Sequence, residues 1–206
     1  MEVAEISFAL RNGLGVTDAQ FDRLFPSSQR RRSQFHWTPI DIALRTCALL
    51  APVQGQRILD VGCGAGKLCI VGALTTTASW LGVEVDLRMV RAAEAVARRL
   101  RLDGQLELVH GDAHAIDWAT FDAIYLFNPF VEGLFDSAVD AGVRHDQYLR
   151  SVERTKQQLL TMRTGARLVT YHGFGGEVPE DFELLHRESV GGDQLCMWVR
   201  GAPSPM

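Results

Sequence analysis

The chain has 206 residues, of which 47% are hydrophobic and 22% are charged, and its formal net charge is −4. This length fits one domain with a sizeable core, and the composition is that of an ordinary globular protein. The charge balance gives no global attraction to nucleic acid or to a membrane, and no apolar stretch reaches the roughly 18 residues of a membrane span.

The first 37 residues differ in composition from the rest, and we expect them to form an N-terminal extension or a lid over residues 38–206. A short helix is predicted over Thr17–Leu24, and a polar, basic stretch follows over Ser27–Ser33. This stretch contains three arginines (Arg30, Arg31, Arg32) and is followed by aromatic residues. The arginines could bind a nucleic-acid backbone while the aromatic residues stack on bases. A solvated linker is the favoured interpretation.

Two features predict a cytoplasmic protein. The N-terminus lacks the positively charged start of a secretion signal. The four cysteines contain no C-x-x-C pair, which indicates buried, reduced thiols. Scattered histidines at spacings unlike those of metal ligands predict that no metal is bound.

From Pro39 onward, short apolar runs alternate with segments whose apolar residues recur at helical spacing. Helices are predicted over Ile40–Leu50, Lys67–Ala78, Leu87–Leu102 and His145–Met162. Strands are predicted over Ile58–Val61, Trp80–Val85, Leu106–His110, Phe121–Phe127, Arg167–His172, Phe182–Val190 and Leu195–Arg200. The alternation predicts an α/β, doubly wound, mainly parallel sheet with helices on both faces. The last two strands follow each other directly, so we expect an antiparallel hairpin at one edge.

The most informative segment is a glycine-rich turn between the first strand and the next helix. It runs Asp60-Val-Gly62-Cys63-Gly64-Ala-Gly66, and its backbone N–H groups can approach an anionic ligand closely. A nicotinamide-binding fingerprint would place a small residue at position 67, where this chain has lysine.

This D-x-G-x-G-x-G pattern and the terminal hairpin resemble the class I S-adenosylmethionine-dependent methyltransferases. The resemblance implies that residues 38–206 form the methyltransferase domain and that S-adenosyl-L-methionine is the cofactor. The segment His36-Trp-Thr38-Pro also resembles a stretch of the seven-strand protein lysine methyltransferases that lies over the methionine end of the cofactor. Thr38 is a candidate there, with an ordinary helix start as the alternative.

The resemblance also implies roles for acidic residues that end the strands, where ligands bind in open α/β sheets. Glu84, in Gly-Val-Glu-Val-Asp, matches the ribose-binding acid, and Asp86 then becomes the N-cap of the next helix. Asp112 and Ala113 match positions that contact adenine, unless Asp112 merely ends its strand. The predicted cofactor site comprises Thr38, Asp60, Gly62, Cys63, Gly64, Gly66, Glu84, Val85, Asp112, Ala113 and Asn128.

The fourth predicted strand ends in Asn128-Pro129-Phe130, which resembles the N-P-P-aromatic motif of amino-group methyltransferases without its second proline. The resemblance implies that these residues position a nitrogen acceptor, although an Asn-Pro turn is the simpler alternative. We therefore expect methyl transfer to nitrogen, with a protein lysine first. The alternatives are an RNA or small-molecule acceptor, or a cofactor-binding protein without turnover. His172 and His36 are weaker candidates for a general base.

Overall fold

The computed structural model describes residues 2–30, 37–131, 134 and 140–202. Its centre is one sheet of seven strands in the order β3-β2-β1-β4-β5-β7-β6. The strands are β1 (Arg57–Val61), β2 (Ser79–Glu84), β3 (Leu106–His110), β4 (Ala123–Leu126), β5 (Arg167–Tyr171), β6 (Phe182–Val190) and β7 (Asp193–Arg200). All neighbours are parallel except that β7 runs antiparallel to both β5 and β6. The predicted fold class and terminal hairpin are confirmed.

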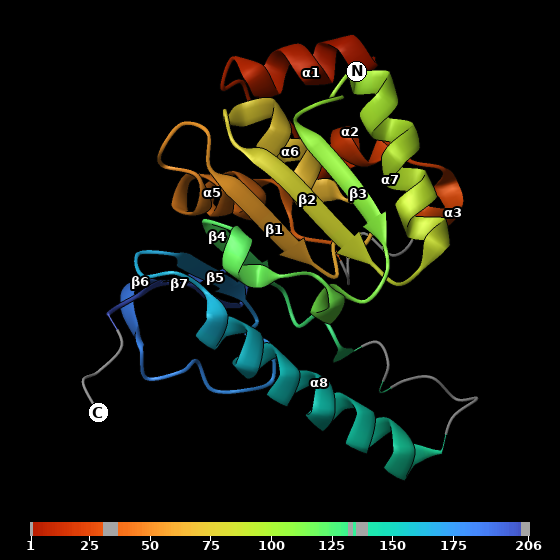
Figure 1. Ribbon diagram of the computed structural model, residues 1–206. Helices are drawn as coiled ribbons and strands as arrows, with labels where there is room; N and C mark the ends of the chain where they lie inside the picture. Colours follow the sequence, from red (N-terminus) through yellow and green to blue (C-terminus); the bar gives the residue numbers. More distant parts are fainter. Residues whose placement is uncertain (1, 31–36, 132–133, 135–139, 203–206) are drawn as a thin grey trace.

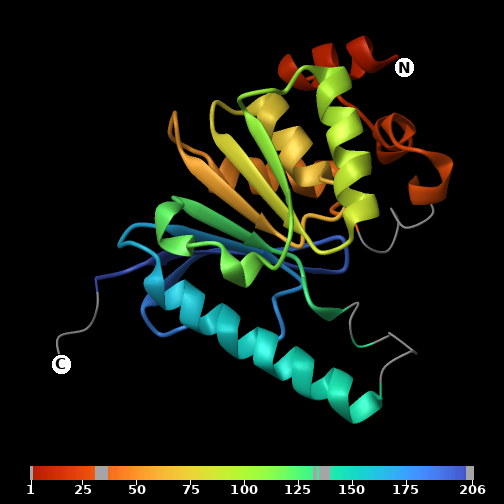
Figure 2. The same ribbon diagram turned by 45° about the vertical axis from the view of Figure 1, so that its right-hand side comes forward.

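Helices cover both faces of this sheet (Figures 1 and 2). One face carries α5 (Ile40–Leu50), α6 (Lys67–Thr75) and α7 (Leu87–Leu100), and the other carries α8 (Ala141–Thr161) with the short 3₁₀ helices η2 (Ala113–Ala115) and η3 (Trp118–Thr120). None of the helices in the described residues is long and apolar enough to cross a membrane.

The alternation of side chains along the central strands builds two cores. In β1, Ile58 belongs to the core beneath α5 and α6, whereas Leu59 and Val61 belong to the core beneath α8. In β4, Tyr125 belongs to the core beneath α5 and α6, and Leu126 belongs to the core beneath α8. Because successive strand residues point to opposite faces, Asp60 points away from α8 and into the core under α5 and α6.

The N-terminal segment is packed into the first of these cores. It contains α1 (Val3–Arg11), α2 (Asp18–Phe21), η1 (Asp22–Leu24) and α3 (Ser27–Arg30), and α1 lies against α6 and α7. Ile6, Phe21 and Phe25 are buried with residues of the sheet. The sequence analysis did not predict α1 or α3. The separate extension or lid stays a prediction, and Arg31, Arg32 and His36 lie outside the described residues.

A buried lysine holds this segment to the start of α6. The Lys67 side chain is 2% exposed, and its ammonium bonds the carboxylates of Asp18 and Asp22, the latter at 2.9 Å. It also lies 5.5 Å from the centre of the Phe21 ring. Asp18 in turn accepts the Ile40 N–H at 3.0 Å, so one carboxylate links α2, α5 and α6. Lys67, the residue that departs from the nicotinamide-binding fingerprint, therefore forms ion pairs inside the protein.

We predict that Lys67→Met destabilises the protein by about 3 kcal/mol, because it removes the buried cation that faces two carboxylates. The free energy of unfolding in urea measures the effect. Arg91→Met on the exposed side of α7 is the control, with an expected change within about 0.5 kcal/mol. Equal stability of the two variants would contradict a structural role for the Lys67 pairs.

Candidate functional site

The glycine loop joins β1 to α6 at the point where the strand order reverses between β1 and β4. Gly62, Gly64 and Gly66 have φ angles of 70°, 56° and 72°, which side-chain-bearing residues rarely adopt. A Cβ atom on Gly62 would lie 3.1 Å from the Cβ of Pro129, whereas one on Gly64 would meet nothing within 4 Å. The loop is therefore tight against the end of β4 and open at Gly64.

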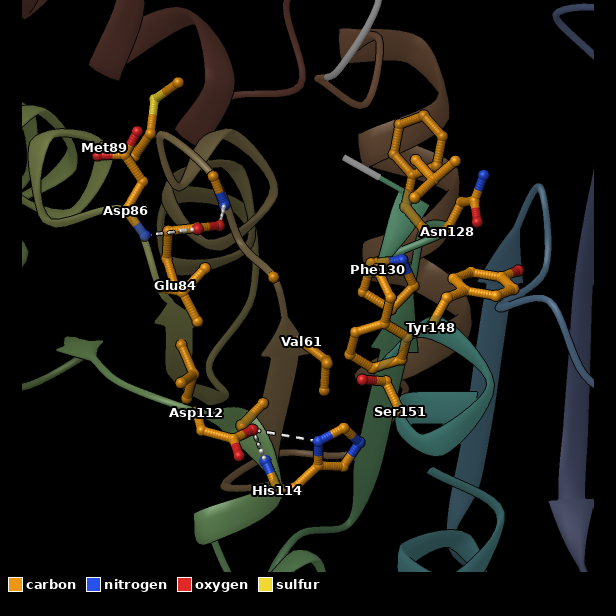
Figure 3. Close-up of a pocket in the computed structure, with 18 of the residues that line it drawn as sticks. Val61, Glu84, Asp86, Met89, Asp112, His114, Asn128, Phe130, Tyr148 and Ser151 are labelled. Atoms are coloured by element: carbon orange, nitrogen blue, oxygen red, sulfur yellow. Dashed lines mark hydrogen bonds and ion pairs between the residues drawn. The ribbon is translucent and has the colours of Figure 1, made fainter. Parts of the chain in front are cut away.

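Glu84, at the end of β2, holds the glycine loop in place through hydrogen bonds. Its two carboxylate oxygens accept the backbone N–H of Gly64 and the backbone N–H of Asp86, each at 2.9 Å (Figure 3). Each oxygen keeps a further lone pair, so the carboxylate can still accept hydrogen bonds from ribose hydroxyls. Asp86 accepts the Arg88 N–H at 2.9 Å, which confirms its predicted place as the N-cap of α7.

Asp112, after β3, belongs to a network that reaches α8. One of its oxygens accepts from the backbone N–H of His114 at 2.9 Å and lies 3.1 Å from His114 Nδ1, and the other accepts from Arg154 at 3.0 Å. Burial acts to raise the pKa of Asp112, but the His114 N–H and the charges of His114 and Arg154 lower it overall. The other ring nitrogen of His114 lies 3.0 Å from Thr155 Oγ1.

The residues after β4 form the facing wall. Asn128 has a φ of 42°, and its N–H donates to the Gly173 carbonyl at 2.8 Å. Phe130 stacks on His114 with ring centres 5.1 Å apart. Figure 3 shows Asn128, Phe130 and Tyr148 across an open space from Glu84, Asp86 and Met89.

These two walls enclose a cavity of about 540 Å³, a size typical of small-molecule and cofactor sites. Nine of the predicted residues line it: Gly62, Gly64, Glu84, Val85, Asp112, Ala113, Asn128, Pro129 and Phe130. The fixed carboxylate of Glu84 and the open Gly64 position fit the adenosyl cofactor that the sequence resemblance implies. Among the described residues, no group of three or more potential ligands is placed to hold a metal ion.

Four predicted residues do not line the cavity: Thr38, Asp60, Cys63 and Gly66. The Thr38 hydroxyl is buried and lies 3.0 Å from the Tyr125 hydroxyl. Gly66 is packed at the start of α6, where a Cβ would lie 3.1 Å from the Cβ of Ala93. Their roles toward the cofactor stay predictions.

The Asp60 side chain is buried and bonded within the protein. Its carboxylate accepts a hydrogen bond from the Cys69 thiol at 3.2 Å, rather than from an amide of the glycine turn. Burial raises the pKa of Asp60 to about 7; the Cys69 bond opposes this rise and the Glu84 charge adds to it. Asp60 therefore belongs to the core under the loop.

Helix α8 also contributes to the cavity, and this contribution was not predicted from the sequence. Arg144, Gln147, Tyr148, Ser151 and Arg154 all line the cavity from this helix. They recur at spacings of three and four, which places them on one helix face. That spacing was visible in the sequence, but nothing local shows which face of a polar helix meets a ligand.

The buried Asp60 carboxyl predicts a specific dependence of stability on pH. The pKa of Asp60 is about 7 in the folded state, against an ordinary value of 3.8 for an aspartate carboxyl, so the folded protein holds the proton more tightly. The contribution of this group is fully present below pH 4 and is lost as the pH rises to 7. Each pKa unit is about 1.4 kcal/mol, so the loss is on the order of 4 kcal/mol.

Asp60→Asn should remove this component, because the amide oxygen can still accept the Cys69 thiol but cannot ionise. The difference in free energy of unfolding between wild type and variant, measured from pH 4 to pH 8, should change most between pH 4 and 7. Asp103→Asn, at an exposed turn, is the control and should run parallel to wild type. A flat difference for Asp60→Asn would refute the buried carboxyl's role.

Comparison with known proteins gives a consistent result. Residues 58–145 match the family model described as "Methyltransferase domain". The chain is 34% identical over 84 residues to an O-methyltransferase of Pyrenophora dematioidea, a match that covers 40% of this chain and 32% of the relative. Other relatives are named as sterol C-, ribosomal RNA and ribosomal protein L11 methyltransferases. The matched region spans about a third or less of the length of most of these curated relatives.

Solved structures share the fold over most of the chain. An RNA methyltransferase of Salinibacter ruber, in complex with S-adenosyl-L-homocysteine, has a TM-score of 0.59 at 22% identity and covers 82% of this chain and 95% of its own. A methyltransferase of Geobacter sulfurreducens has a TM-score of 0.62 at 16% identity, covering 97% and 96%. At these identities the likeness shows the fold alone. The family match over residues 58–145 and the observed sheet order agree with the resemblance of this chain to the class I S-adenosylmethionine-dependent methyltransferases.

Proposed function

We propose that this chain binds S-adenosyl-L-methionine at the rim of its sheet and transfers the methyl group to a nitrogen acceptor, with a protein lysine as the first candidate. The observation that carries the proposal is the convergence of Glu84, the Gly64 amide and Asp112 on one cavity that Asn128 faces from the opposite wall. Bound there, the cofactor supplies a methyl group on a positively charged sulfur.

In this proposal the residues of one wall bind the cofactor. Glu84 accepts hydrogen bonds from the ribose, and the Asp112–Ala113 turn contacts the adenine. The Asp112 carboxylate is already bonded to His114 and Arg154, so it enters the site fixed and ionised. Fixed acceptors bind a ligand with little loss of side-chain entropy, which supports a preformed cofactor site.

The opposite wall suits the acceptor. The Asn128 side chain offers an amide oxygen that can accept an N–H, and Phe127 and Phe130 line the same end of the cavity. Aromatic faces attract a cationic amine before it loses its proton. Holding the lone pair in line with the methyl carbon is the main catalytic task, and such alignment contributes about 7–11 kcal/mol in well-oriented systems.

An RNA or a small molecule is the second candidate for the acceptor, because relatives are named as an O-methyltransferase and as a ribosomal RNA methyltransferase. That the chain catalyses methyl transfer at all is also part of the proposal. A solved structure that shares the fold, with a TM-score of 0.53, is titled a [4+2]-cyclase. Labelled methyl transfer from S-adenosylmethionine into a cell lysate, fractionated into protein, RNA and small molecules, separates these candidates. Label in protein supports the first candidate, and label confined to another fraction rejects it.

We predict that Glu84→Ala weakens binding of S-adenosylhomocysteine by about 1.5–3 kcal/mol, because it removes charged acceptors and frees the Gly64 amide. Isothermal titration measures the loss. The control is Glu107→Ala, which removes an exposed carboxylate of β3 far from the cavity, and its affinity should match that of wild type. Tight binding of a nicotinamide dinucleotide instead would argue against the proposed cofactor.

We predict that Asn128→Ala lowers turnover by about 10²-fold while leaving the affinity for S-adenosylhomocysteine nearly unchanged, because the acceptor is no longer oriented. Alanine also strains a backbone with a φ of 42°. Asn128→Gly removes the amide without that strain and should lose as much turnover. If the glycine variant keeps wild-type turnover, the amide of Asn128 has no part in the reaction.

A further inference from the structure

His172 follows β5 directly and lies beside the cavity described above. Its Nδ1 forms an ion pair with the carboxylate of Asp193, which is the first residue of the antiparallel strand β7. Both side chains are partly exposed, at 36% and 37%. The pair exists only because β7 runs back beside β5 and brings its first residue to the end of β5.

The backbone of His172 is held in a costly conformation. Its φ of 60° lies in the left-handed region, as does the φ of 42° at Asn128. Such a conformation is unfavourable for a residue that carries a side chain. The two residues end adjacent parallel strands, and the Asn128 N–H donates to the carbonyl of Gly173 at 2.8 Å. Strain that the surrounding structure maintains at two neighbouring cavity residues is typical of functional sites.

Aromatic packing fixes the plane of the imidazole. The Phe127 ring stacks on it with centres 5.1 Å apart and planes 16° apart, and the Tyr171 ring meets it edge-on at 4.3 Å. With Nδ1 committed to Asp193, the nitrogen left for chemistry is Nε2. Within the described part of the chain, no hydrogen-bond partner occupies Nε2.

His114 and Glu84, two other ionisable residues that line the cavity, already have hydrogen-bond partners. His114 is bonded through both ring nitrogens, to Asp112 and to Thr155. Glu84 holds two backbone amides with its two oxygens. Burial also lowers the pKa of His114, the Asp112 charge opposing this shift. His172 differs because one ring nitrogen is oriented by a carboxylate while the other is open.

We propose that His172 is the general base that takes the proton of the methyl acceptor, and that Asp193 is the residue that positions it. This inference rests on the proposed function and deepens it, because it implies an acceptor that arrives carrying a proton, such as the ammonium of a lysine side chain. A nucleophile that already presents a free lone pair would need no such residue.

The proposed reaction is a proton transfer to His172 followed by a displacement at the methyl carbon. The acceptor N–H bond breaks, its electron pair stays on nitrogen, and the proton goes to Nε2 of His172. The nitrogen lone pair then forms the bond to the methyl carbon as the carbon–sulfur bond breaks, with its electrons left on a neutral sulfur. The imidazolium, stabilised by the Asp193 carboxylate, afterwards releases the proton to water.

The orientation of His172 can be tested without any acceptor. ¹⁵N-histidine NMR of the full chain, with S-adenosylhomocysteine present and His172→Gln used for assignment, reports which ring nitrogen of the neutral imidazole carries the proton. We expect Nδ1–H in wild type and a shift toward Nε2–H in Asp193→Ala, because free imidazole rings of histidine favour the latter. A wild-type Nε2–H form, or no change in the variant, would overturn the Asp193 role.

The base role is tested on whichever lysate fraction wild type labels. His172→Gln should lower the initial rate by about 10²-fold or more, with cofactor affinity within twofold of wild type. His172→Ala should regain part of its rate in free imidazole, which a purely structural role would not allow. His186→Gln, on edge strand β6 outside the cavity, is the control.

Wild-type-like labelling by His172→Gln would reject the base while leaving the proposed function standing. If wild type binds S-adenosylhomocysteine but labels no fraction, the proposed transfer fails and the base assignment falls with it. The two failures are therefore distinguishable.

Discussion

The two hydrogen bonds that Glu84 accepts from Gly64 and Asp86 determine the rest of this structure. They tie the glycine loop after β1 to the end of β2 and present the same carboxylate to the cavity. A glycine loop has many accessible conformations when free, so an external carboxylate is needed to select one of them. The group that orders the loop is thus also the group placed to bind a ligand.

The ordered loop leads directly into α6, and the first residue of that helix extends the order to the N-terminus. Lys67 is buried among Asp18, Asp22 and the Phe21 ring. A buried ammonium is stable only when it is paired, so the ion pairs of Lys67 join the N-terminal helices to the start of α6. The N-terminal segment therefore packs against the helix that follows the glycine loop.

The far side of the cavity follows a different principle. There the chain has unfavourable backbone angles at Asn128 and His172, and the rings of Phe127 and Tyr171 pack against the His172 imidazole. The wall that contains Glu84 and Asp112 is satisfied internally by hydrogen bonds, whereas the wall that contains Asn128 and His172 keeps open polar groups on a rigid base. Rigid walls around a reacting centre are what alignment catalysis requires.

Several features were predictable from sequence because they depend on local pattern. Alternating apolar runs predicted the strands and the hairpin. The glycine turn and the residues that end the second, third and fourth strands predicted nine residues that line the cavity. The polar α8 was predicted to begin at His145 but begins at Ala141, since its start is set by an Asp140 cap. The amphipathic α1 was not predicted at all.

What the sequence determined by itself was the order of strands and helices and the residues at the strand ends, because hydrophobic periodicity and glycine turns act over a few neighbouring positions. Only the tertiary structure decided the partners that lie far apart in the chain. Asp60 with Cys69, Lys67 with Asp18 and Asp22, and His172 with Asp193 each depend on which element packs beside which. Such pairings follow from the packing of whole elements, and no local pattern encodes them.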